Sequence, residues 1–154
     1  MKALYLLAAA LLPSSALAAP DDLKVCEAIP AGDVESAVGI KVVSAKPGYH
    51  ECTWQPAEPD RFVSATALKR AQHTLSGANE YAAQMKSMGF TITVTDETPD
   101  LWCAKAVPPP NMSAQFVECR ALTKGHYFEV HVVGPDSSRE KAKALVSKMA
   151  ARLP

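Results

Sequence analysis

The chain has 154 residues, with 16 basic and 16 acidic side chains spread along it and a formal net charge of zero. Nucleic acids and anionic membrane surfaces bind concentrated positive charge, so this even distribution argues against both as partners. The length suits one domain.

Residues 1–18 have the pattern of a secretory signal peptide. Lys2 supplies a positive start, residues 3–12 are uninterruptedly apolar, and Ala16-Leu17-Ala18 is a small-x-small cleavage site. A bilayer needs about 20 apolar residues, so this run is too short to span one. We expect cleavage after Ala18, leaving residues 19–154 as a single domain in the periplasm or outside the cell, without an integral membrane segment.

Apolar periodicity predicts the elements of the first half of the chain. A helix over 31–38 follows Pro30 and ends at Gly39. Strands are expected over 41–44, 49–55 and 62–70. From residue 75 the spacing changes to a helical period, and Gly89 ends that helix; its apolar stripe is Ala78, Tyr81, Ala82, Met85 and Met88.

The second half is predicted to contain four strands and a terminal helix. Strands are expected over 90–94, 101–107, 113–123 and 126–133, with a loop at 96–100 and the Pro108-Pro109-Pro110 run as an exposed connection. A two-residue Lys124-Gly125 turn would pair Thr123 with His126. The last helix, 137–153, would begin with a Ser137/Glu140 capping box. Together these elements predict an α+β fold: an antiparallel β-sheet with helices packed on one face, stapled by two disulfides.

The staples are expected from Cys26, Cys52, Cys103 and Cys119, an even set in a chain with a signal peptide. Three pairings are possible, and we favour Cys26–Cys52 with Cys103–Cys119 because each bond is then local to its own half of the chain. No two cysteines have the spacing of a zinc knuckle or a thioredoxin motif.

The stretch from Cys26 to Gln55 resembles the opening of a group of small exported bacterial proteins of unknown function. Those proteins begin with a Cys, continue with a short helix ending in Gly, and reach a Cys-x-Trp or Cys-x-Tyr. Here the matching residues are Cys26, Gly39 and Cys52-Thr53-Trp54. The resemblance covers about a third of the chain and implies a Cys26–Cys52 disulfide in an α+β domain. It brings no catalytic residues.

Motifs for catalysis, metals or cofactors are missing from the sequence. The four histidines lack ligand spacing, no nucleophilic serine motif occurs, and no Gly-rich phosphate loop is present. We therefore expect no metal, no cofactor and no enzymatic activity.

One surface constellation follows from the predicted register. If Cys103 bonds Cys119 across neighbouring strands, Trp102 lies opposite Arg120, and the hairpin places Glu118 opposite His131. This mixture of aromatic, Arg and His residues is typical of a recognition surface, although a solvated sheet face with cross-strand ion pairs is the alternative. The candidate binding residues are Trp102, Glu118, Arg120, Tyr127, Glu129 and His131.

Three functions are compatible with these patterns. The leading hypothesis is a non-enzymatic binding or protein-interaction module, whose partner would be an unknown protein or small molecule of the cell envelope. The second is a carrier of a small ligand, held between helices and sheet by Tyr81, Met85 and Phe128. The third is a small hydrolase using His131 with Glu118 as an acid–base pair.

Overall fold

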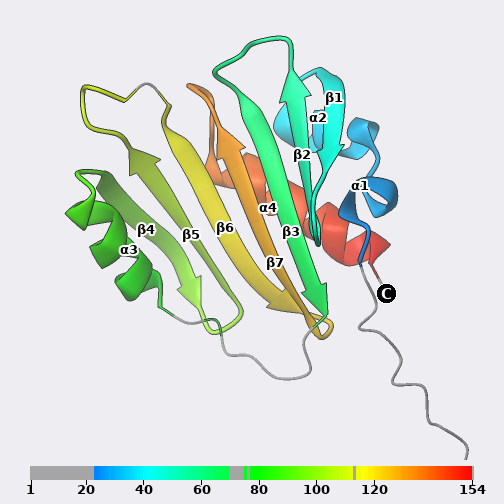
Figure 1. The fold of residues 1–154 in the computed structure, drawn as a ribbon. Coiled ribbons are helices and arrows are strands. Elements are labelled where there is room, and N and C mark those ends of the chain that lie inside the picture. Colours follow the sequence, from blue (N-terminus) through cyan, green and yellow to red (C-terminus); the bar gives the residue numbers. More distant parts are fainter. Residues whose placement is uncertain (1–22, 70–74, 76, 113, 154) are drawn as a thin grey trace, which may run out of the picture.

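The computed structural model describes residues 23–69, 75, 77–112 and 114–153, so the expected signal peptide lies outside the described residues. Seven strands form one antiparallel sheet in the order β1-β2-β3-β7-β6-β5-β4 (Figure 1). The strands are β1 (Val42–Pro47), β2 (Glu51–Pro56), β3 (Phe62–Lys69), β4 (Thr91–Thr98), β5 (Leu101–Val107), β6 (Phe116–Thr123) and β7 (His126–Val133). The helices are α1 (Val25–Ala28), α2 (Ala31–Val38), α3 (Ala78–Ser87) and α4 (Arg139–Arg152).

Two antiparallel meanders make up the sheet. The first contains β1, β2 and β3, and the second contains β4, β5, β6 and β7. They join where β3 pairs with β7 along its whole length, from Phe62↔Val133 to Lys69↔His126. The first strand of each meander, β1 in one and β4 in the other, therefore forms an edge of the sheet.

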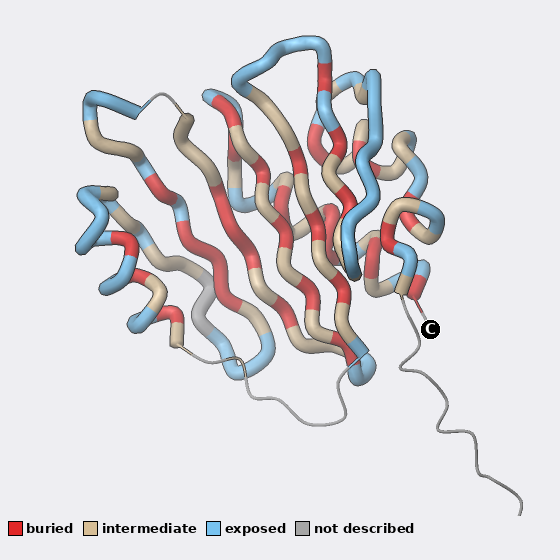
Figure 2. The backbone as a smooth tube through the Cα atoms, viewed as in Figure 1, coloured by how far each residue is buried: buried red, intermediate tan, exposed pale blue. Residues whose placement is uncertain are grey.

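The inner face of the sheet carries the main hydrophobic core, and α1, α2 and α4 cover it (Figure 1). Alternate residues of β7 point into this core, which gives the alternating buried and half-buried colouring of the strand in Figure 2. The largest fully buried side chains on this face are Ile29, Trp54, Phe128, Leu145 and Met149. Among the described residues, no helix is long and apolar enough to span a membrane.

Helix α3 lies on the opposite, outer face, over β4 and β5 (Figure 1). Ala78, Trp102 and Ala104 form a second, smaller core there, with Tyr81 packed against it. The α+β class, the antiparallel sheet and both disulfides are thus confirmed. The structure adds that one of the four described helices covers the other face of the sheet.

The predicted β6–β7 hairpin is confirmed residue by residue. Thr123 pairs with His126, and Cys119 pairs with Val130. The two turn residues have positive φ angles, 51° at Lys124 and 74° at Gly125. Positive φ at both central positions is the geometry of the turn whose twist matches paired strands, so this turn fixes the register of everything beside it.

Several predicted boundaries were wrong. Residues 96–98, expected as a loop, continue β4 beyond an irregularity between Thr95 and Thr98. The short helix α1 was not predicted. The capping box at Ser137 and Glu140 is also displaced, because the N-cap of α4 is Ser138, whose Oγ accepts a hydrogen bond from the backbone N–H of Lys141.

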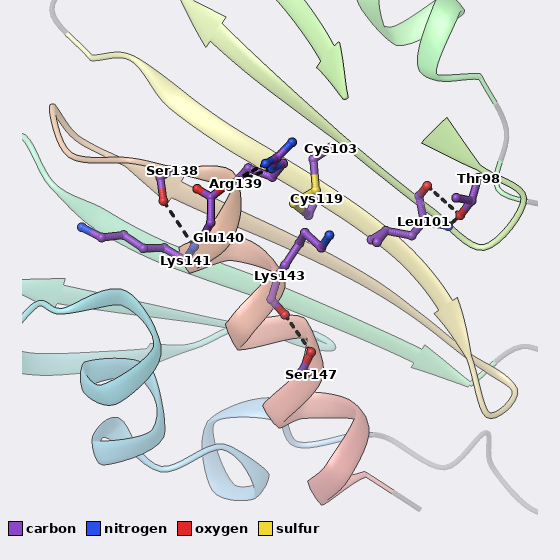
Figure 3. The surroundings of a disulfide bond; sticks show 10 residues. All are labelled: Thr98, Leu101, Cys103, Cys119, Ser138, Arg139, Glu140, Lys141, Lys143 and Ser147. Atoms are coloured by element: carbon purple, nitrogen blue, oxygen red, sulfur yellow. Dashed lines mark hydrogen bonds and ion pairs between the residues drawn. A yellow bond between two sulfur atoms is a disulfide. The ribbon is translucent and has the colours of Figure 1, made fainter. Parts of the chain in front are cut away.

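Each disulfide ties together neighbouring elements within one half of the chain. Cys26–Cys52 joins α1 to β2, and Cys103–Cys119 joins β5 to β6. Figure 3 shows the second disulfide on the α4 side of the sheet, near the beginning of that helix. Both bonds were predicted with these partners, because each closes a short loop, with sequence separations of 26 and 16 residues.

Removing either disulfide should lower the free energy of unfolding by about 3 kcal/mol, since loops of this size restrict the unfolded chain by that amount. The test is urea denaturation of the double variants Cys26→Ala/Cys52→Ala and Cys103→Ala/Cys119→Ala. Fully reduced wild-type protein serves as the control and should lose at least as much. An unchanged midpoint in either double variant would contradict the prediction.

Candidate functional site

The six candidate residues lie on the outer face of the sheet, on three neighbouring strands. The predicted cross-strand pairs are present: Trp102 lies opposite Arg120, and Glu118 lies opposite His131. Together with Tyr81 from α3 they form a set of contacts that we call the Arg120 network: Tyr81, Trp102, Glu118, Arg120, Tyr127, Glu129 and His131.

Arg120 bridges two carboxylates. Its Nε donates a hydrogen bond of 2.6 Å to Oε1 of Glu118 and lies 3.2 Å from Oε2 of Glu129. The Glu118 side chain is only 1% exposed, whereas those of Arg120 and Glu129 are about a quarter exposed. The network therefore contains one deeply buried charge, compensated by a guanidinium that still reaches solvent.

The same guanidinium lies against two aromatic rings. Its central carbon is 5.3 Å from the ring centre of Tyr81 and 5.0 Å from that of Trp102, within the range of cation–π attraction. Trp102 is 2% exposed because α3 covers it, so its predicted place on an exposed recognition surface was wrong. Tyr81 was missed as a member of this surface, since strand register gives no information about a residue that comes from a helix.

The second carboxylate, Glu129, is held from two sides. The Tyr127 hydroxyl donates to its Oε2 over 2.6 Å, and Nε2 of His131 donates to its Oε1 over 2.9 Å. His131 also stacks on the ring of Phe116, with ring centres 6.0 Å apart. Tyr127, Glu129 and His131 are partly exposed. They form the accessible part of the network.

These contacts shift the pKa values of the groups involved. Burial alone would raise the pKa of Glu129, but hydrogen bonds from His131 and Tyr127 and the charge of Arg120 lower it to about 2. Burial alone would lower the pKa of His131, but the bond to Glu129 and the charges of Glu118 and Glu129 raise it. Burial and the hydrogen bond to Glu118 raise the pKa of Tyr81. The network thus favours ionised Glu129 and protonated His131.

Glu118, Glu129 and His131 also form a possible metal-binding group, which the sequence did not predict. One ligand atom from each lies within 4.8 Å of the others, and carboxylate and imidazole groups bind divalent cations. However, Arg120 already supplies the positive charge between the two carboxylates. A metal ion would have to displace this guanidinium and deprotonate His131, so the residues do not fit a resident metal.

The residues predicted for the two alternative functions lie on the two faces of the sheet. For the hydrolase, Nε2 of His131 lies 3.6 Å from Oε2 of Glu118 on the outer face, and the Glu118 side chain is 1% exposed. The proposed carrier pocket cannot form from its predicted residues, because Tyr81 packs on the outer face whereas Phe128 belongs to the inner core.

A hollow of about 310 Å³ lies on the inner face, between the start of α4 and the strands β4 and β5. Cys103, Ser138, Arg139 and Glu140 are among its lining residues, and all four are drawn in Figure 3. A helix N-terminus attracts anions, and here the carboxylate of Glu140 is the anion that it holds. Hydrogen bonds from its backbone N–H and from Arg139 and Ser138 lower the pKa of its carboxyl. The helix start that lines the hollow is therefore already occupied by the carboxylate of Glu140.

Acid should weaken the protein through Glu129. A carboxylate whose pKa falls from 4.5 to about 2 on folding adds stability that is complete above pH 4.5 and is lost as the pH drops towards 2. We therefore expect Glu129→Gln to be less stable than wild type at pH 7, with a difference that narrows between pH 4.5 and 2. Urea midpoints across this range measure it. Glu58→Gln, at an exposed loop position, is the control, and a pH-independent difference for Glu129→Gln would contradict the prediction.

Comparison with known proteins adds no family to this description. No protein-family model matches the chain, and no curated protein matches it significantly. Its function is therefore inferred from the residues of the site.

Proposed function

We propose that this chain is a non-enzymatic binding module, exported to the periplasm or the cell exterior, which holds a partner protein on the outer face of its sheet. Two disulfides support an oxidising compartment, where such bonds persist. The partner would be a protein of the cell envelope.

The observation that carries the proposal is the ordered, partly open Arg120 network. Arg and Tyr residues are enriched where proteins meet, and side chains held in place before binding lose less entropy when a partner arrives. Tyr127, Glu129 and His131 are held by their bonds to one another and remain accessible. Beside them, β3 adds Ser64 and Thr66, which pair with His131 and Glu129.

The arrangement favours binding over catalysis. Glu118 is buried and neutralised by Arg120, and Glu129 is bonded to His131, Tyr127 and Arg120. A general acid or base needs a proton that it can exchange with a substrate. Here both carboxylates are bonded to neighbouring side chains, as expected for groups that support a structure or recognise a partner.

Site-specific photo-crosslinking in the native host tests the proposal. A photoreactive side chain at Thr66, on the outer face beside Glu129, should give a covalent adduct with one partner protein, identified by mass spectrometry. The same group at Thr91, on the edge strand β4, should give none. Glu129→Gln in the Thr66 background should reduce the adduct about tenfold, as expected for the loss of about 1.4 kcal/mol of binding.

Folding of each variant is verified by its urea midpoint. Equal adducts at Thr66 and Thr91, or an adduct at Thr66 that is unaffected by Glu129→Gln, would show that the outer face does not select a partner through this network.

A further inference from the structure

A pocket lies beside the network, where α3 meets the sheet. Its volume is about 260 Å³, and its lining residues are Gly77, Glu80, Tyr81 and Gln84 of the α3 segment and Arg120 of β6. We call it the Arg120 pocket. Sites for drug-sized ligands usually measure about 300–1,000 Å³, so this one has the size for a single small molecule or one unit of a longer chain.

Arg120 enters this pocket already oriented. Its hydrogen bond and both of its ion pairs use Nε, and two aromatic rings fix the plane of the guanidinium. The two terminal nitrogens carry the remaining N–H donors of the side chain. A guanidinium offers these donors as a planar fork that suits two neighbouring oxygen atoms. A ligand with such a pair of acceptors would bind without first ordering the side chain.

The charges around the pocket determine which net charge of ligand it favours. Glu80 stands at its rim, with its carboxylate against Gly77, and Glu118 and Glu129 lie behind Arg120. These three negative charges disfavour a phosphate or carboxylate ligand, whereas the guanidinium disfavours a cation. A neutral ligand avoids both penalties.

The donors and acceptors of the pocket narrow the choice further. Arg120 donates, Glu80 accepts, and the Gln84 amide does both. A hydroxyl group also both donates and accepts, so two adjacent hydroxyls can receive hydrogen bonds from Arg120 while donating to Glu80 or Gln84. Neighbouring hydroxyls on a neutral ring are the defining feature of sugars.

We propose that the Arg120 pocket binds one neutral sugar unit through a pair of adjacent hydroxyls. The sugar is either free or the end of a glycan. This inference goes beyond the proposed function, because the sugar occupies a pocket of its own beside the partner-binding face and can be tested on the isolated protein.

The test is titration of the purified protein with glucose, galactose and N-acetylglucosamine separately, followed by tryptophan fluorescence and by saturation-transfer NMR. Trp102 lies against Arg120, so its emission should report binding. At least one sugar should saturate the protein, and Arg120→Lys and Gln84→Ala should each weaken binding about tenfold or more. Gln84 is exposed, so its variant keeps the test valid if Arg120→Lys fails to fold. Gln55→Ala, at an exposed position of β2, is the matched control and should bind like wild type.

A trisaccharide of the sugar that binds separates the two sources. Tighter binding of the trisaccharide assigns the pocket to a glycan end, and equal or weaker binding assigns it to a free sugar. The proposal is overturned if no sugar gives a saturable signal below about 10 mM, ten times the dissociation constant of a weak 1 mM complex, or if both pocket variants bind like wild type. Crosslinking at Thr66 is independent of these outcomes, so failure of the sugar site leaves the partner-binding proposal to its own test.

Discussion

The buried carboxylate of Glu118 imposes the constraint on which the outer face depends. A charge that is 1% exposed is costly unless a partner of opposite charge and hydrogen bonds accompany it into the interior. Arg120 supplies the charge, and the Tyr81 hydroxyl supplies a further bond. Since Tyr81 belongs to α3, this hydrogen bond links that helix to the buried carboxylate of Glu118 on β6. An isolated hairpin of β6 and β7 could not hold this carboxylate in the same way.

This constraint explains why the two faces of one sheet differ so strongly. The inner face is an apolar layer under α4, where packing and area dominate. The outer face has an apolar layer only under α3, and beside it the side chains pair by charge. Antiparallel sheets commonly leave one face to solvent. Here the outer face has three parts: one covered by α3, the half-buried Arg120 network beside it, and an open part on β3. The Arg120 network therefore lies at the edge of α3.

The features that could be predicted from the sequence are those that local geometry controls, namely the hairpin turn, its register and the face on which each strand residue lies. The turn at Lys124 and Gly125 fixes one register, and alternation along β6 and β7 then determines which side chains share a face. Cross-strand neighbours of Arg120 followed directly from this. The burial of Trp102 did not follow, because the helix that covers it is amphipathic whichever face of the sheet it meets. The periodic pattern of the helix does not record which face of the sheet it will cover.

The strand order also bears on how the chain folds. The two meanders meet at β3 and β7, which are separated by most of the second half of the sequence, whereas each disulfide stays within one half of the chain. Both disulfides can consequently form by oxidation of their thiols before the two halves of the chain pair. The pairing of β3 with β7 closes the longest loop in the sheet, so we expect it to cost the most chain entropy and to form last. Until β7 has paired with it, β3 has an open edge, and the unpaired N–H and C=O groups of such an edge can pair with another chain.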